Sequence, residues 1–382
     1  MVREPNPYRP GFNQAPGVLA GRDDVLAAAR EALDVAALDG RTPRPLVLVG
    51  SRGVGKTVLL GEIAAMAGSA LGWLTVAIEV RPRRPFTAQL RERLDAATEL
   101  LRDTSDEARF ELASATARAS VLGIGGEIGV VRRNPVPSVD DLAIEHSLAS
   151  AVGAASERSS GLVLTVDEVQ SASKVELAEL AATLQQHVPD DWPLVVALAG
   201  LPSVRDVGRS VTYLERGEWH EIGLLDHVDS VFALEGPAAA AGRPLERRGA
   251  DILADASGGY PYAVQVLGHY AWRRSTGKRR IDAAPCREAL ADAERDLASG
   301  LYAGRWGDAA PKEREYLATV ARLLVEGDLE EVTGADVAAA MDVTAKQLSY
   351  VRDRLLKKGT LVAFGRGLRF PVPGMARWID QR

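Results

Sequence analysis

Apolar and polar positions in the first 225 residues follow two different periods. Short, mainly apolar runs predict strands over residues 46–49, 73–80, 162–166 and 194–199, and the wholly apolar run 46–49 suits a strand that is buried on both faces. Between them, apolar residues recur every three or four positions, which predicts helices over residues 23–38, 56–67, 87–119, 140–156 and 175–187. Strands that alternate with helices indicate βαβ units. We therefore expect an α/β fold in which helices cover both faces of a parallel sheet.

The strand pattern fades after about Leu225, and helical patterns dominate the rest of the chain. This change predicts three domains: an α/β nucleotide-binding base over residues 1–224, a helical lid over 225–308 and a small winged-helix domain over 309–382. Within the base, the glycine-spaced stretch "VLGIGGEIGVV" predicts a hairpin or a loop insertion.

Composition excludes several classes of protein. Of the 382 residues, 46% are hydrophobic and 26% charged, which suits ordinary globular cores. The net charge of −6 argues against a uniformly basic coat for nucleic acid, and the single cysteine, Cys286, excludes a disulfide framework. No apolar run approaches the roughly 20 residues that cross a bilayer. We expect a cytoplasmic protein with no membrane partner.

The stretch "GSRGVGKT" after the first strand matches the phosphate-loop pattern G-x-x-x-x-G-K-[ST]. Glycine permits the positive φ angles and close approach that a backbone needs to wrap phosphates. The lysine reaches the β- and γ-phosphates, and the hydroxyl ligates Mg²⁺. The predicted ATP-binding residues here are Gly50, Gly53, Val54, Gly55, Lys56, Thr57 and Val58.

An acidic pair ends the third apolar strand, in "GLVLTVDEVQ". Asp167 is placed to hold Mg²⁺ together with Thr57, and Glu168 is a candidate base that activates water. An acidic turn after a core strand is common by itself. Combined with the phosphate loop it predicts a nucleoside triphosphatase.

Three segments resemble the AAA+ ATPases, in the group of the origin-recognition-type initiators and the archaeal-type, STAND-like ATPases. These segments are "GVLAGRDDVLAAAREAL", the "DE" pair and "SGGYPYAVQVLGHYAW". The resemblance implies that Val18, Leu19 and Arg22 lie beside the adenine and that Pro261 of the Gly-x-Pro element lies near the base. It also implies ATP rather than GTP as the nucleotide, with Mg²⁺.

Two family features lack a clear counterpart. The polar sensor at the end of the fourth strand is missing, with only Ser203 nearby. The start of the lid helix offers Tyr260, Tyr262 and Gln265 and no arginine before Arg273. These departures predict slow hydrolysis, or ATP used as a switch.

The segment "SVTYLERGEWHEIGLLD" resembles the part of AAA+ proteins that carries an arginine finger, an arginine donated to a neighbouring subunit. The resemblance makes Arg216 the first catalytic candidate and Arg209 the second, and leaves open a homo-oligomer or another protein partner. The alternative is that Arg216 is solvated, or paired with Glu215 or Glu218.

From about Pro311, three helical patterns and two short strand patterns around Gly-Arg-Gly resemble the winged helix of the origin-recognition-type initiators. Residues 344–382 hold nine lysines and arginines and two acids, a net charge of +7 within an acidic chain. Such segregation is typical of phosphate contact. The predicted DNA-binding residues are Lys346, Gln347, Tyr350, Arg354, Lys357, Lys358 and Arg366.

Three functions fit these patterns. The first is an ATP-dependent AAA+ switch that binds DNA through the winged helix. The second is a STAND-like signalling or defence ATPase, whose winged helix contacts protein or inhibits the enzyme. The third is an accessory ATPase that acts through a partner enzyme.

Overall fold

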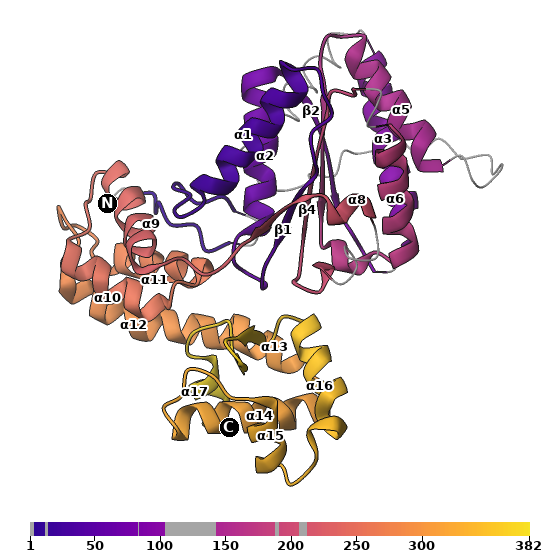
Figure 1. Ribbon diagram of the computed structural model, residues 1–382. Helices are drawn as coiled ribbons and strands as arrows, with labels where there is room; N and C mark the ends of the chain where they lie inside the picture. The colour runs from indigo at the N-terminus through magenta and orange to yellow at the C-terminus, as the bar shows by residue number, and fades with distance from the viewer. Residues whose placement is uncertain (1–3, 12–13, 83, 104–142, 188–190, 206–211) are drawn as a thin grey trace.

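The computed structural model describes residues 4–11, 14–82, 84–103, 143–187, 191–205 and 212–382 (Figure 1). The expected end of the third helix over 104–119, the insertion around "VLGIGGEIGVV" and Arg209 lie outside these residues.

Within the described residues a parallel sheet of five strands forms the centre of the base, in the order β2-β3-β4-β1-β5. The strands are β1 (Leu46–Val49), β2 (Leu74–Glu79), β3 (Leu162–Asp167), β4 (Leu194–Gly200) and β5 (Glu218–Glu221). Every residue of β1, β3 and β4 is buried, as expected of central strands that are covered on both faces.

Helices cover both faces of this sheet, which confirms the predicted fold class (Figure 1). Leu46, Leu48 and their neighbours pack against one pair of helices, α1 (Asp23–Ala37) and α2 (Lys56–Leu71). Alternate residues such as Val47 and Val49 belong to the cluster on the other face, formed with α3 (Phe86–Arg102), α5 (Ala143–Ser156) and α6 (Lys174–Gln186).

The fifth strand was missed by the sequence pattern. β5 has the sequence "EWHE" and is only partly buried at the sheet edge, where it pairs with β1 alone among the described strands. An edge strand need not be apolar on both faces, so it carries no continuous apolar run. A short helix, α8 (Thr212–Glu215), precedes it.

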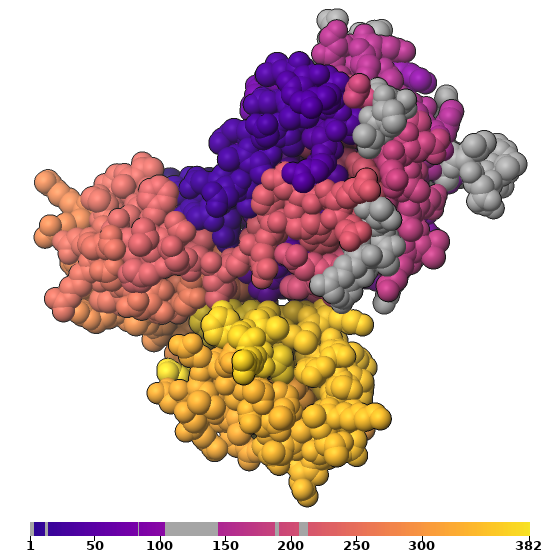
Figure 2. Space-filling view, in the orientation of Figure 1, coloured from indigo at the N-terminus to yellow at the C-terminus, as the bar shows by residue number. Residues whose placement is uncertain are grey.

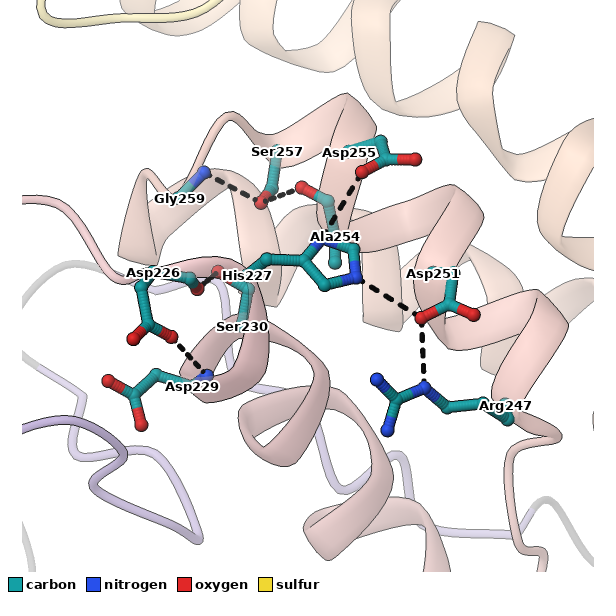
Figure 3. Close-up of polar contacts among 10 residues, drawn as sticks. All are labelled: Asp226, His227, Asp229, Ser230, Arg247, Asp251, Ala254, Asp255, Ser257 and Gly259. Carbon is teal, nitrogen blue, oxygen red and sulfur yellow. Dashed lines mark hydrogen bonds and ion pairs between the residues drawn. The ribbon is translucent and has the colours of Figure 1, made fainter.

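Next come the helices α9 (His227–Ala240), α10 (Arg247–Ser257), α11 (Pro261–Arg274) and α12 (Ala283–Leu297). Asp226 caps α9 by accepting a hydrogen bond from the Asp229 amide. The ring of His227 lies 3.2 Å from the carboxylates of both Asp251 and Asp255, which links α9 to α10 (Figure 3). Below, we use the name lid for residues 225–297 only, a shorter range than the lid of residues 225–308 that the sequence predicts.

The extended N-terminal residues also pack on the lid. Tyr8 is 2% exposed and donates a hydrogen bond to the carbonyl of Leu234 at 2.5 Å. Its ring lies against Gly268, where an added Cβ would come within 2.4 Å of a ring carbon.

A turn of π-helix (Ala298–Tyr302) and the short α13 (Ala303–Gly307) connect the lid to the rest of the chain, and we call residues 298–310 the connector. The C-terminal module, residues 311–382, holds α14 (Pro311–Glu326), α15 (Gly334–Ala340), α16 (Ala345–Lys357), the hairpin of β6 (Val362–Phe364) and β7 (Gly367–Arg369), and α17 (Met375–Asp380). The three helices and the hairpin lie where the sequence placed them. The winged-helix assignment itself stays a prediction.

The C-terminal module lies directly against the base and the lid (Figure 2). None of the described helices is both long and apolar enough to cross a membrane.

Gly161 supplies a stability test of the sheet. A Cβ at this position would lie 2.5 Å from the Trp73 ring and 2.6 Å from the Pro193 carbonyl oxygen. We expect Gly161→Ala to destabilise the protein by about 2 kcal/mol, because overpacking a tight site forces neighbours to move. Urea unfolding followed by circular dichroism measures this change.

Gly153→Ala in α5 is the matched control, since a Cβ there would meet no heavy atom within 4 Å. We expect it to be neutral or to stabilise by about 0.5–1 kcal/mol, as helical Gly→Ala changes do. Equal midpoints for the two variants would contradict the packing described for Gly161.

Candidate nucleotide site at the phosphate loop

The predicted phosphate loop joins β1 to α2 in a conformation that only glycine adopts readily. Gly53 and Gly55 have φ angles of +84° and +98°. Gly50 lies so close to β5 that an added Cβ would come within 2.2 Å of the Ile222 carbonyl oxygen. No side chain caps the N-terminus of α2, so the loop presents its backbone N–H groups and the positive end of the helix dipole. This arrangement suits an anion.

Lys56 lies within the loop and is 6% exposed. Its Nζ donates to the carbonyl oxygens of Gly50 at 3.0 Å and Ser51 at 2.9 Å. Burial lowers the pKa of this ammonium group, although the charges of Asp167 and Glu168 oppose the shift. The loop therefore holds a buried cation whose hydrogen-bond partners are neutral carbonyls.

The side chains of Thr57 and Asp167, the two residues expected to hold Mg²⁺, are in contact. The Thr57 hydroxyl donates to Asp167 Oδ2 at 2.5 Å, and Oδ1 accepts from the amide of Glu168 at 2.8 Å. Asp167 is the last residue of β3 and is 8% exposed. A hydroxyl beside a buried carboxylate is an oxygen donor set of the kind that Mg²⁺ prefers, so these residues fit the metal.

Glu168 is held by a residue that the sequence analysis did not assign. Its Oε2 accepts a hydrogen bond from Gln170 Nε2 at 2.6 Å, and Gln170 Oε1 accepts from the Leu201 amide at 2.9 Å. The Arg52 guanidinium lies 4.0 Å from the same carboxylate. Gln170 thus connects the candidate base to the end of β4, where the resemblance led us to look for a polar sensor. The signal was the glutamine of "DEVQ", two positions after Glu168.

The residues assigned to the adenine lie at the junction of base and lid. Arg22 donates to the carbonyl oxygens of Val54 at 3.2 Å and Gly223 at 2.8 Å, so it joins the phosphate loop to the segment that follows β5. Val18 packs against α9, where a Cβ on Gly236 would lie 2.9 Å from its methyl carbon.

The other residues assigned to the nucleotide are placed as follows. Val54 is 1% exposed, whereas Leu19 and Val58 are half-buried. Pro261 is the first residue of α11.

The Gly-x-Pro element contacts the phosphate loop through its middle residue. Tyr260 is 1% exposed, and its hydroxyl donates to the Arg52 carbonyl at 3.0 Å. The ring packs so closely on the loop that a Cβ at Gly53 would lie 1.8 Å from the Tyr260 oxygen. The lid is therefore attached to the phosphate loop itself.

The C-terminal module reaches the same loop. A Cβ on Gly359, just after α16, would lie 3.6 Å from the Arg52 amide nitrogen and 3.4 Å from a methyl carbon of Leu201. Arg305 of the connector donates to the carbonyl oxygens of Gly359 and Arg52, each at 3.3 Å. Arg305 follows α11, where the resemblance placed the lid arginine, by about 30 residues.

Arg216 directly follows α8 and is exposed. Among the described residues it makes no ion pair with Glu215 or Glu218, and Glu218 lies instead near Arg44 at 3.7 Å. An exposed arginine at the sheet edge is compatible with the predicted role in a neighbouring subunit, which stays a prediction.

Two of the predicted DNA-binding cations are engaged inside the C-terminal module. Glu313 of α14 is 2% exposed and pairs with Lys358 at 2.6 Å and Arg354 at 3.0 Å. Burial by itself would raise the pKa of this carboxyl group, but the hydrogen bonds from Lys358 and the Ala310 amide, with the two positive charges, lower it overall. The other predicted DNA contacts are exposed, namely Lys346, Gln347, Tyr350, Lys357 and Arg366.

Comparisons with known proteins agree with this geometry. Residues 18–197 match the family model of the AAA ATPase domain, and residues 299–379 match a domain of unknown function, DUF8462. The comparison with curated proteins found no match.

Solved structures share the fold at low sequence identity. A Walker-type ATPase of Pyrococcus abyssi is similar with a TM-score of 0.58 and 15% identity, over 96% of this chain and 97% of that one. A variant of RuvB from Thermotoga maritima is similar with a TM-score of 0.51 and 17% identity, over 94% and 96% of the two chains. The family match and these folds agree with the phosphate loop and the acidic pair, and residues 18–197 accordingly belong to the AAA ATPase domain family within a P-loop NTPase fold.

Proposed function

We propose that this protein is a Mg²⁺-dependent ATPase that acts as a switch, in which the nucleotide at the phosphate loop controls the position of the C-terminal module. One observation carries the proposal. The loop that would hold the phosphates accepts a hydrogen bond from Tyr260 of the lid, and Arg305 links the same loop to Gly359 of the C-terminal module. A ligand bound there competes with, or adds to, contacts made by both neighbours, which supplies the differential contacts that a switch requires.

The residues of the loop have separate roles in this proposal. Lys56 would exchange its carbonyl partners for phosphate oxygens, which form stronger, charge-assisted hydrogen bonds. Mg²⁺, held by Thr57 and Asp167, would offset the charge of the phosphates. Glu168 would orient the attacking water and accept its proton.

The contacts of Glu168 support slow turnover. Its carboxylate already accepts from Gln170 and lies near Arg52, so it must leave or share these partners before it can act on water. Among the described residues after β4, Leu201 is apolar and Ser203 is half-buried, and the polar side chain that reaches the Leu201 amide is that of Gln170. Arg216 of a neighbouring subunit would supply added positive charge if the protein assembles into a homo-oligomer.

We propose DNA as the target of the switch. Exposed cations and polar side chains lie along α16, at Lys346, Gln347, Tyr350 and Lys357, and Arg366 extends the exposed set to the hairpin tip. Because Arg354 and Lys358 are paired with Glu313, we assign the main phosphate contacts to Lys346 and Lys357.

A second candidate function is that of a STAND-like signalling or defence ATPase, in which the C-terminal module contacts a protein or inhibits the ATPase. The link from Gly359 through Arg305 to the Arg52 carbonyl favours it, since it joins the module to the loop. DNA binding separates the two candidates.

Two single substitutions test the ATPase. We expect Lys56→Ala to lower ATP affinity by at least 100-fold, because it removes the cation that faces the phosphates. We expect Glu168→Gln to keep ATP affinity within about threefold and to lower the hydrolysis rate by at least 100-fold, since the amide cannot accept a proton. Fluorescent-nucleotide titration and phosphate release measure both quantities. Normal affinity in Lys56→Ala, or normal turnover in Glu168→Gln, would contradict the assignment.

A charge reversal tests DNA as the target. We expect Lys346→Glu with Lys357→Glu to weaken binding to duplex DNA by at least tenfold and to reduce the salt dependence by about two phosphate contacts. Lys312→Glu with Arg322→Glu is the control, because both residues are exposed on α14 of the same module. Equal affinity of the two double variants, measured by fluorescence anisotropy, would exclude α16 as the DNA contact and favour the STAND-like candidate.

A further inference from the structure

Residues 4–9 run along the lid in an extended form, with neither helix nor strand. Every second side chain of this segment makes a polar contact with the lid. Glu4 forms an ion pair with Arg243. The side-chain amide of Asn6 donates to Nδ1 and to the carbonyl oxygen of His269, at 3.0 and 3.1 Å. The segment therefore contacts the lid through alternate positions, as an extended chain does when it lies along a surface.

Tyr8 is the third of these positions and the most deeply buried. Its hydroxyl donates to the Leu234 carbonyl, and the lid leaves room for its ring by having a glycine at position 268. A Cβ on Gly268 would come within 2.4 Å of a ring carbon. Next to the ring, the amide of Arg9 donates to Gln265 Oε1 at 3.1 Å. The lid thus has a fitted place for a tyrosine and a hydrogen-bond acceptor for the backbone that follows it.

The lid also has a buried cation for the acidic end of the segment. The side chain of Arg243 is 3% exposed, lies 4.1 Å from the centre of the Trp272 ring and donates to the Trp272 carbonyl and the Ser275 hydroxyl. Among the described residues, the one carboxylate that pairs with it is that of Glu4. A buried charge is costly without a counter-charge. Here the counter-charge comes from outside the lid.

The segment is stiff before it docks. Its sequence, "EPNPYRP", places prolines at positions 5, 7 and 10, next to the side chains that contact the lid. Proline fixes φ, so such a segment loses less conformational entropy on binding than a flexible chain does. Extended, proline-containing segments that bind through spaced side chains are a common class of peptide ligand.

We propose that the lid carries a peptide-binding site and that residues 4–9 fill it as a built-in ligand that can be exchanged. The ligand is an extended, proline-containing segment with an acid, an amide and a tyrosine at alternate positions, Glu-x-Asn-x-Tyr. Because the chain's own segment is covalently attached, it is present at an effective concentration of about millimolar, and a free segment binds only where the attached one is weakened. A partner protein that presents such a segment would dock on α9 and α11. The inference does not rest on the proposed ATPase function.

Peptide binding to the full chain tests the proposal. The probe is a fluorescein-labelled peptide of residues 4–11, "EPNPYRPG", followed by fluorescence anisotropy. We expect full-chain Tyr8→Ala, whose own segment is weakened, to bind this peptide at least tenfold more tightly than the wild type, whose site is filled. The peptide that carries Tyr8→Ala should bind to neither protein.

Two glycines of the same chain supply matched controls in the Tyr8→Ala background. A Cβ at Gly268 takes the space that the tyrosine ring of the peptide needs, so Gly268→Ala should weaken peptide binding at least tenfold. Gly304→Ala should leave the affinity unchanged, because a Cβ there meets no heavy atom within 4 Å.

Tighter binding by Tyr8→Ala that is lost with Gly268→Ala and kept with Gly304→Ala supports the proposal. Equal or absent binding by the wild type and a folded Tyr8→Ala protein would overturn it and leave residues 4–9 as a fixed part of the lid. Equal affinity of the two glycine variants would overturn it as well.

If Tyr8→Ala does not fold, Glu4→Lys with Asn6→Ala takes its place. These changes remove the ion pair with Arg243 and the hydrogen bonds to His269, and they leave the buried ring of Tyr8 in position. The same tenfold gain over the wild type is expected for the peptide. Its absence would overturn the proposal.

Discussion

The carbonyl oxygen of Arg52, in the phosphate loop, accepts hydrogen bonds from both Tyr260 and Arg305. The arrangement of the lid and the C-terminal module depends on this point of contact. It requires a loop without side chains on its inner surface, because a Cβ at Gly53 would overlap the Tyr260 hydroxyl. The glycines of the loop therefore serve two needs at once: they allow the backbone to surround phosphates, and they allow a tyrosine to rest on that backbone.

The acidic and the basic side chains around the loop differ in their hydrogen-bond partners. The acids already have polar partners, since Asp167 accepts from Thr57 and Glu168 from Gln170. Among the described residues, the buried Lys56 and the half-buried Arg305 have carbonyl and hydroxyl partners and no carboxylate partner. Such a site is prepared for an anion, and its positive groups come from segments far apart in the sequence. We propose that the lid and the C-terminal module respond when the cations of the site exchange carbonyl partners for phosphate oxygens.

The sequence was sufficient where a short local pattern determines the structure. The phosphate loop and the acidic pair are contiguous motifs, and the central strands are mostly apolar and buried throughout, so the fold class could be predicted. The edge strand β5 was missed because its sequence, "EWHE", has no apolar run. Arg305 was missed for another reason: only the folding of the connector brings it to Arg52, which is 253 positions away in the chain. Contacts between domains leave no local pattern from which to predict them.

The most direct measurement of the central claim is a distance between the base and the C-terminal module in each nucleotide state. Spin labels at Ser69→Cys on α2 and Lys357→Cys on α16 occupy exposed positions, whereas the native Cys286 is fully buried and should not react. Electron–electron resonance would then compare the protein without nucleotide, with ADP, and with AMP-PNP and Mg²⁺. The account predicts that the distance distribution shifts with AMP-PNP relative to the nucleotide-free protein. An identical distribution in all three states, with nucleotide shown to be bound, would contradict it.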